Sequence, residues 1–274
     1  MRVSDRPAFR PSRRRGQNFL VDRGIQRRIA QAAQLPPEAV VLEIGAGTGL
    51  LTEALRPFAS RVIAVEVEPQ LAEPLRERFA DDEAITVVNA DALALDIATL
   101  GVGDYHVVAN LPFSVGTRLL VELLQSTSPP QSLTVLLQRD VVDRACAPPG
   151  KMRLLSVIVQ SLAEPRRLFD IPPGAFRPRP KVTSTLLRLR PRPLDARDRV
   201  HVSRRIAAAR RAFGQPRKQL ANALGSPTGI AASLEGRGID PKRRPETLTL
   251  EEWDAVAEAL AYLPTTATTV SLAP

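Results

Sequence analysis

Residues 40–55 read VVLEIGAGTGLLTEAL, and this stretch decides the fold. The apolar run from Val40 to Ile44 predicts a strand buried on both faces. Three glycines at alternate positions follow it directly (Gly45, Gly47 and Gly49), and glycines permit a tight turn that a ligand can approach closely. Apolar residues from Leu50 to Leu55 then predict a helix, whose amino end favours polar or anionic groups. A strand, a glycine turn and a helix in this order predict an α/β protein with a ligand site at the turn.

The same alternation continues towards the carboxyl end. Short apolar runs at residues 61–67, 85–88, 105–109 and 133–137 predict further buried strands, with helical stretches between them, the first of which contains Pro74 and is expected to kink there. Strands and helices that alternate in this way predict a parallel, doubly wound sheet. We expect Leu154–Leu162 and residues 183–189 to complete it as an antiparallel pair. The predicted fold is a Rossmann-like, mostly parallel, seven-stranded sheet.

Beyond Pro193 the pattern becomes purely helical. Apolar positions in residues 202–213 form one stripe, and Thr249 with Glu252 makes a capping box ahead of Trp253, which we interpret as a core anchor. We therefore expect residues 1–194 to form one domain with a basic N-terminal arm, and residues 195–263 a small all-helical domain. The Thr-rich, aperiodic residues 264–274 are interpreted as a disordered tail.

Positive charge is concentrated in two blocks. The net charge is +9, yet residues 1–28 hold nine arginines against two acidic residues, and residues 188–244 hold 15 basic residues against four acidic ones. Arginine forms forked hydrogen bonds with phosphate, so these blocks indicate a polyanionic partner; solvated charged faces are the alternative. The candidate contacts are Arg13, Arg14, Arg15, Arg204 and Arg211.

The composition excludes several kinds of chemistry. One cysteine (Cys146) and two histidines provide no internal disulfide, too few ligands for an ordinary zinc site and little basis for a catalytic triad, so we expect no metal. A small buried hydrophobe is the default role for Cys146. No apolar run is long enough to cross a bilayer and no signal core is visible. We expect a cytoplasmic monomer that has no membrane partner.

The glycine turn and two acidic residues at predicted strand ends indicate a nucleoside cofactor. In the turn, Leu50 stands where a nicotinamide-type fingerprint has its third glycine, so the glycine spacing argues against NAD. The spacing resembles instead the turn of S-adenosylmethionine-dependent methyltransferases. Glu66 ends the second strand, about 20 residues past the turn, where a carboxylate can accept both ribose hydroxyls. Asp91 follows the third strand and can accept from the adenine amine of the cofactor. A tight structural turn with solvated acids is the alternative.

The fourth predicted strand ends in Asn110-Leu111-Pro112-Phe113. Hydrogen bonds from an adenine amine to the Asn110 side-chain oxygen and the Leu111 carbonyl would make its nitrogen more pyramidal and reactive. Pro112 would stiffen the loop and Phe113 would stack on the base. Methyl transfer from a sulfonium needs positioning more than acid–base catalysis, which suits a chain so poor in histidine and cysteine.

With Gly16-Gln17-Asn18-Phe19-Leu20, this tetrapeptide resembles the ribosomal RNA adenine dimethyltransferase family. Matching segments include residues 138–144, residues 155–157, the stretch Phe176-Arg177-Pro178-Arg179-Pro180-Lys181-Val182 and, in the helical part, residues 238–241 and 244–246. The likeness covers roughly residues 13–262 and is greatest to the branch that dimethylates two adjacent adenines near the 3′ end of small-subunit RNA.

The resemblance implies a class I methyltransferase fold, S-adenosylmethionine as cofactor, and small-subunit rRNA or an immature small-subunit particle as partner, with a role in its biogenesis. It implies cofactor contacts at Asn18, Leu20, Gly45, Gly47, Glu66, Asp91 and Asn110, and makes Phe176 a candidate for the second face of an aromatic sandwich around a flipped adenine. Two departures, Phe113 where this branch usually has tyrosine and a short loop at residues 148–153, keep a large-subunit antibiotic-resistance methyltransferase open. A DNA adenine methyltransferase and a ribosome assembly factor with incidental methylation are further alternatives.

Overall fold

The computed structural model describes residues 17–262. The chain divides into two compact units, Met1–Cys146 with Leu162–Arg192, and Ala147–Ser161 with Pro193–Pro274. The second unit therefore includes residues 147–161, which the sequence analysis assigned to the first domain. Arg13, Arg14, Arg15 and the rest of the expected basic arm lie outside the described residues, as does the expected tail. Across residues 17–262, no helix has both the length and the apolarity that crossing a membrane requires.

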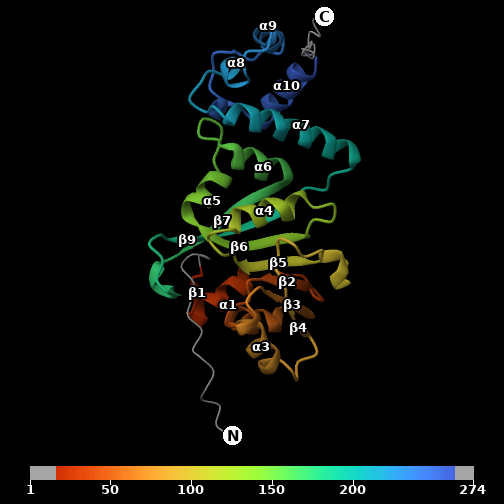
Figure 1. Cartoon of the computed structure of the whole chain (residues 1–274), viewed down its shortest axis with the longest axis vertical. Coiled ribbons are helices and arrows are strands. Elements are labelled where there is room, and N and C mark those ends of the chain that lie inside the picture. Colours follow the sequence, from red (N-terminus) through yellow and green to blue (C-terminus); the bar gives the residue numbers. More distant parts are fainter. Residues whose placement is uncertain (1–16, 263–274) are drawn as a thin grey trace, which may run out of the picture. The chain divides into compact units, whose positions relative to one another are not determined.

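A seven-stranded sheet with the order β4-β3-β2-β5-β6-β9-β7 forms the centre of the first unit (Figure 1). Strands β4, β3, β2, β5 and β6 are parallel to one another, and β9 is antiparallel to both β6 and β7. This confirms the predicted mostly parallel, doubly wound sheet. The strands are β2 (Val40–Ile44), β3 (Arg61–Glu66), β4 (Ile85–Asn89), β5 (His106–Asn110), β6 (Ser132–Gln138), β7 (Ala163–Ile171) and β9 (Ser184–Pro191).

One predicted strand is wrong. Leu154–Leu162 forms helix α6, and the antiparallel partner of β9 is β7, which begins at the next residue. A short, continuously apolar run looks the same in a buried helix and a buried strand, so periodicity could not separate them. The true strand was hidden because it contains Pro165, Arg166 and Arg167. Such residues are tolerated there because, among the described strands, β7 lies at the edge of the sheet and pairs with β9 alone.

Helices connect the parallel strands as the sequence pattern predicts. Asp22 caps α1 by accepting from the amide of Ile25 (2.9 Å), and α3 continues through Pro74. A two-stranded sheet pairs β1 (Phe19–Leu20) with β8 (Phe176–Arg177). The helices of this part are α1 (Arg23–Ala32), α2 (Leu50–Leu55), α3 (Pro69–Arg78), α4 (Gly116–Gln125) and α5 (Arg139–Ala145), with short 3-10 turns η2 (Arg56–Phe58), η3 (Ile97–Leu100) and η4 (Pro173–Ala175).

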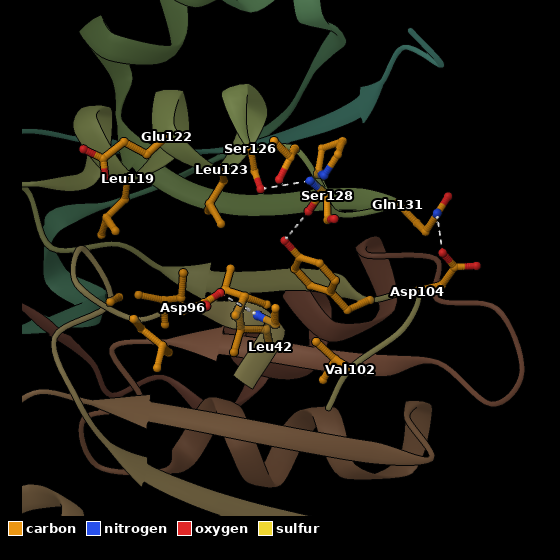
Figure 2. A pocket seen from close by; sticks show the side chains of 18 of the residues that line it. Leu42, Asp96, Val102, Asp104, Leu119, Glu122, Leu123, Ser126, Ser128 and Gln131 are labelled. Carbon is orange, nitrogen blue, oxygen red and sulfur yellow. Dashed lines mark hydrogen bonds between the residues drawn. The ribbon is translucent and has the colours of Figure 1, made fainter. Parts of the chain in front are cut away.

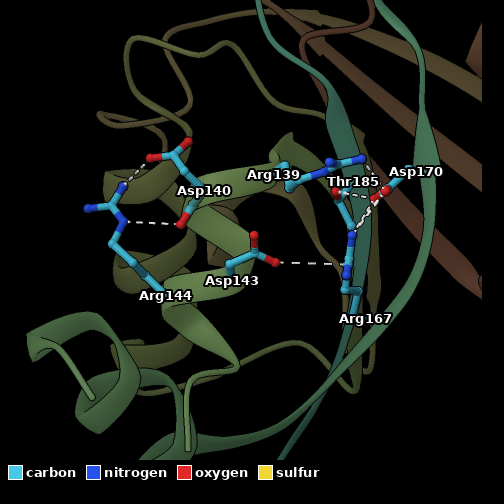
Figure 3. Close-up of polar contacts among 7 residues, drawn as sticks. All are labelled: Arg139, Asp140, Asp143, Arg144, Arg167, Asp170 and Thr185. Atoms are coloured by element: carbon cyan, nitrogen blue, oxygen red, sulfur yellow. Dashed lines mark hydrogen bonds and ion pairs between the residues drawn. The ribbon is translucent and has the colours of Figure 1, made fainter. Parts of the chain in front are cut away.

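A polar network joins α5 to the antiparallel strands (Figure 3). Asp170 of β7 accepts from Arg167 (2.8 Å) and from the hydroxyl of Thr185 (2.6 Å), and it also pairs with Arg139. These bonds hold the pKa of Asp170 below its usual value, the Thr185 bond being the largest cause. The segment 138–144, quoted above for its family resemblance, therefore has a structural explanation in the first unit.

The second unit is helical and has its own core. Trp253 is fully buried at its centre, and its ring centroid lies 5.6 Å from that of Phe213. Thr249 and Glu252 form the predicted capping box at the start of α10. The helix that follows α7 begins at Leu220. The helices are α6, α7 (Ala196–Phe213), α8 (Leu220–Ala223), α9 (Ile230–Glu235) and α10 (Leu250–Ala261), with the 3-10 turn η5 (Pro245–Thr247).

Candidate active site

The glycine turn lies at a topological switch point of the sheet. Strands β2 and β5 are hydrogen-bonded neighbours, although β3 and β4 separate them in the chain. In open α/β sheets, ligands bind at such a point, beyond the carboxyl ends of the strands. Gly45 (φ 76°) and Gly47 (φ 57°) both have left-handed backbones. A Cβ on Gly47 would lie 2.9 Å from the Phe19 ring, so only glycine lets Phe19 pack on the turn.

Glu66 ties the end of β3 to this turn. Its Oε2 accepts from the amide of Gly47 (2.8 Å) and its Oε1 from the amide of Glu68 (2.9 Å), while only 4% of the residue is exposed. Burial raises the pKa of this carboxyl, and the hydrogen bond from Gly47 opposes the rise. Each carboxylate oxygen can accept more than one hydrogen bond, so Glu66 retains acceptor capacity for a ligand.

Asp91 and Asn110 follow the next two strands of the site. Asp91 is exposed, and its Oδ1 accepts from the amide of Leu93 (3.0 Å), which fixes an Asx-type turn. Asn110 ends β5, and its Nδ2 donates to the carbonyl of Asn18 (3.2 Å). That bond sets the orientation of the amide, and its Oδ1 has no partner among the described residues. The side chain therefore offers an acceptor.

A cavity of about 530 Å³ brings most of the predicted site residues together. Its size falls within the roughly 300–1,000 Å³ typical of small-molecule pockets. Of the predicted residues, Asn18, Gly45, Gly47, Glu66, Asp91 and Asn110 to Phe113 line it. Sequence reasoning did not assign Gln17, Phe19, Val67, Leu93, Ser114 and Val115, which line it as well. Gln17 and Phe19 stood within the quoted Gly-Gln-Asn-Phe-Leu segment, whereas Leu93 had no signal of its own.

Two predicted residues do not line this cavity. Phe176 is fully buried and packs in the same core cluster as Leu20, which is 5% exposed. The two residues are also paired between β1 and β8, and the Leu20 carbonyl accepts from Gln26 Nε2 (2.6 Å). In this structure they support the cavity wall through the small sheet, because Leu20 is only two residues from Asn18 and adjacent to Phe19.

Glu43 is a second buried acid beside the turn, to which the sequence analysis gave no role. Its Oε2 accepts from the hydroxyl of Thr52 (2.6 Å), and 1% of the residue is exposed. Burial raises its pKa to about 8, while the Thr52 bond lowers it and the charge of Glu66 raises it further. The hydrogen bond between Glu43 and Thr52 joins β2 to α2.

A larger cavity, of about 670 Å³, lies between α4, the 3-10 turn η3 and the loop before β5 (Figure 2). Several of its polar groups are already engaged in hydrogen bonds within the protein. Asp104 accepts from Gln131 Nε2 (2.8 Å), the Tyr105 hydroxyl donates to the carbonyl of Ser128 (3.1 Å), and Asp96 caps η3 at the amide of Ala98 (3.0 Å). It contains none of the paired strand-end acceptors described above. The smaller cavity is therefore the candidate active site.

In the second unit, Arg204 and Arg211 are exposed and lie seven residues apart on α7. This spacing places them on the same face of the helix, two turns apart. Neither has an ion pair among the described residues, whereas Arg205 between them pairs with Asp254 through Nε (2.7 Å). Residues 17–262 contain no cluster of three or more histidine, cysteine or acidic side chains suited to a metal ion.

Comparison with known proteins identifies the family of this chain. A family model described as ribosomal RNA adenine dimethylase matches residues 8–262. Ribosomal RNA small subunit methyltransferase A of Moorella thermoacetica is 40% identical over 271 residues, covering 92% of this chain and 93% of that protein. The protein of the same name from Pseudomonas fluorescens is 38% identical, covering 97% and 100%.

Two solved structures are similar over most of their length. The 23S rRNA methyltransferase ErmE is 27% identical with a TM-score of 0.70, and the match covers 89% of this chain and 100% of that one. A dimethyladenosine transferase from Plasmodium falciparum has a TM-score of 0.74 at 20% identity, covering 87% and 95%, which supports the fold alone. With the family model matched from residue 8 to residue 262, this chain belongs to the ribosomal RNA adenine dimethylase family.

Proposed function

We propose that this protein transfers methyl groups from S-adenosylmethionine to N6 of two adjacent adenines in the 3′-terminal hairpin of small-subunit rRNA, during small-subunit biogenesis. Membership of the adenine dimethylase family supports the reaction. The small-subunit target is supported by the names of the bacterial relatives, which exceed ErmE in sequence identity.

The observation that carries the proposal is the orientation of the Asn110 amide. Its nitrogen is occupied by the carbonyl of Asn18, so its oxygen is the atom left to accept a hydrogen bond at the cavity. An adenine amine is a hydrogen-bond donor, and accepting from it concentrates the lone pair on nitrogen. Because Asn18 comes from the segment before β1, the N-terminal residues and the end of β5 define this acceptor together.

The neighbouring residues position the base. Phe113 is half-buried, lines the cavity and offers a ring face for stacking on the base. The fixed backbone angle of Pro112 restricts the loop that links Asn110 to Phe113. The carbonyl of Pro112 accepts from the amide of Gly116 (2.7 Å), which anchors the loop to the start of α4. A loop restrained at both ends can hold the amine in line with an electrophilic carbon, which is the main requirement of this displacement.

The cavity fits the proposed methyl donor. S-adenosylmethionine supplies an electrophilic sulfonium methyl group when bound. Glu66 and Asp91 are acceptors at successive strand ends, suited to ribose hydroxyls and an adenine amine, and Phe19, Leu93 and Val115 provide apolar surface. The absence of a side chain at Gly47 lets the Phe19 ring pack against the turn, which shapes this wall of the cavity. Gly45, Gly47, Glu66 and Asp91, with Asn18 and Asn110, would hold the donor.

Arg204 and Arg211 would contact the RNA from the second unit, together with Arg13, Arg14 and Arg15 of the N-terminal segment. The two α7 residues support this because they are exposed, share a helix face and lack ion pairs within residues 17–262. We propose that the protein works in the cytoplasm as a monomer.

The test is to incubate the protein and labelled donor with under-methylated small and large ribosomal subunits, and to map modified bases by mass spectrometry. We expect two dimethylated adenines near the 3′ end of small-subunit RNA. Modification of large-subunit RNA instead would favour the antibiotic-resistance alternative.

Asn110→Ala separates catalysis from a purely structural role in assembly. We expect it to abolish methylation, while Asn222→Ala, an amide removal in the other compact unit, retains it. Subunit assembly that is intact with Asn110→Ala would favour an assembly factor with incidental methylation.

A further inference from the structure

Like charges face each other across the antiparallel edge of the sheet. The register of β7 and β9 places Arg166 directly opposite Arg188, and Glu164 directly opposite Arg190. Directly opposed residues project from the same face of a sheet, and opposed like charges destabilise it. On the other side of β9, Thr134 of β6 lies directly opposite Arg188. Its buried hydroxyl has no hydrogen-bond partner in the described part of the chain. The pairing of Arg166 with Arg188 therefore requires a compensating interaction.

The protein itself supplies little negative charge to Arg188. Only 6% of this residue is exposed, and its Nη1 donates to the carbonyl of Ala32 (3.3 Å) and to the side-chain oxygen of Gln34. Both acceptors are neutral. Within residues 17–262, Nε and Nη2 of Arg188 have no partner. Burial lowers the pKa of this guanidinium, and the charges of Arg190 and Arg166 lower it further.

These side chains surround a cavity of about 270 Å³, lined by Glu164, Pro165, Arg166, Arg188 and Arg190. Its one acidic residue, Glu164, already pairs with Arg192 (3.4 Å between Oε1 and Nη1). Arg166 and Arg190 are exposed and form no ion pair with any described residue. The cavity is thus concave and carries excess positive charge, and one of its guanidinium groups is already held in place by α1.

We propose that this arginine pocket (Arg166, Arg188 and Arg190) binds a phosphate group of the RNA backbone, an inference that rests on the proposed function. Phosphate offers several acceptor oxygens in a compact anion, and arginine donates to it in a forked geometry. An anion bound between Arg166 and Arg188 would attract both guanidinium groups and so offset the repulsion between them.

The arginine pocket is separate from the candidate active site. Arg188 lies opposite Thr134, near the start of β6, whereas the active-site cavity lies beyond the carboxyl ends of the parallel strands. A phosphate bound there would position the RNA without contacting the reacting base, as phosphate contacts generally do. Free inorganic phosphate has the same chemistry, so the experiment must separate the two sources.

The test compares the full-length wild type with the double variant Arg166→Ala/Arg190→Ala. Both side chains are exposed, so the variant retains the core, and Arg188 keeps its bonds to α1. The matched control is Arg76→Ala/Arg118→Ala, which also removes two positive charges, each from an ion pair between exposed side chains of one helix. One readout is the melting temperature with inorganic phosphate against chloride at equal ionic strength. The other is the salt dependence of binding to small-subunit RNA.

We expect phosphate to raise the melting temperature of the wild type and the control, and this rise to be lost in the Arg166/Arg190 variant. In low salt without phosphate, that variant should melt at the same temperature as the wild type or higher, because a repulsion has been removed. Its plot of log affinity against log salt should be shallower than that of the control by about 0.7–0.9, the change expected for one lost phosphate contact.

If the Arg166/Arg190 variant lost the phosphate effect but kept an RNA salt slope equal to that of the control, the assignment to RNA would be overturned. The pocket would then be a site for a free anion. No phosphate effect in the wild type, with an unaltered slope in the variant, would overturn the pocket altogether. Failure of the proposed function gives a different result. In that case the wild type would not methylate ribosomal RNA, whereas the phosphate effect on melting, measured without RNA, would persist.

Discussion

Glu66→Gln tests whether one carboxylate both builds the glycine turn and binds the donor. In the structure, the two oxygens accept from two different backbone amides, those of Gly47 and Glu68. Glutamine has a single acceptor oxygen, so its NH₂ group must face one of these two donors. An unsatisfied buried donor costs about 1–3 kcal/mol. Glutamine also avoids the desolvation cost that raises the pKa of Glu66, so we expect a net loss of about 1–2 kcal/mol in the free protein.

Donor affinity should fall by more than this loss in stability suggests. Hydrogen bonds from ribose hydroxyls to a charged acceptor contribute about 1.5–3 kcal/mol, so the dissociation constant should rise about 10- to 150-fold. The assays are urea unfolding without ligand, hydrogen exchange of peptides that cover the turn, and calorimetric titration with S-adenosylmethionine. Asp81→Asn is the control, because Asp81 is exposed and no described residue pairs with it.

The turn peptides should exchange faster in Glu66→Gln than in the control. Unchanged exchange and unchanged urea stability would refute the carboxylate's role in holding the turn. Unchanged affinity with a weakened turn would instead remove Glu66 from the donor site.

Three further changes test other parts of the molecule. Glu43→Gln should gain stability relative to the wild type as pH rises from about 5 to 7.5, by up to about 1.4 kcal/mol per pH unit. The reason is that a folded-state pKa of about 8 makes the folded wild type retain a proton that the unfolded chain releases. If urea unfolding gave a stability difference between the two proteins that is independent of pH, this reasoning would be contradicted. Gly47→Ala should lower the free energy of unfolding by at least about 1–2 kcal/mol and weaken donor binding, since the added Cβ meets Phe19. Gly174→Ala is the control, because a Cβ at that position meets no other atom. In the same melting and calorimetry experiments it should change neither stability nor donor binding. Arg204→Ala/Arg211→Ala should weaken RNA binding and flatten its salt dependence with donor affinity intact, and an unchanged salt slope in filter binding would argue against a basic face on α7.

The parallel part of the fold was predictable because its signals are local. Buried strands such as Val40–Ile44 form continuous apolar runs, and the glycine turn, Asp22 and the Thr249 capping box depend on neighbours within a few residues. Once strands and helices alternate, the carboxyl ends of the parallel strands must lie at one edge, so the convergence of strand-end acids there followed from topology alone.

The antiparallel edge was not predictable in the same way. Whether Leu154–Leu162 is a helix or a strand depends on what covers it, because both bury a continuous apolar run equally well. The edge strand β7 carries a proline and two adjacent arginines that would be unfavourable at the centre of a sheet, and only its position makes them acceptable.

By itself, the sequence determined the kind of reaction, the glycine turn and the parallel core, since each rests on residue types at short, fixed spacings. Only the tertiary structure decided that Asn18 orients the Asn110 amide, that Phe176 packs in the core, and that Arg166 faces Arg188. These three facts join segments that lie far apart in the chain or on different strands. They depend on register and packing, which no local pattern of residues encodes.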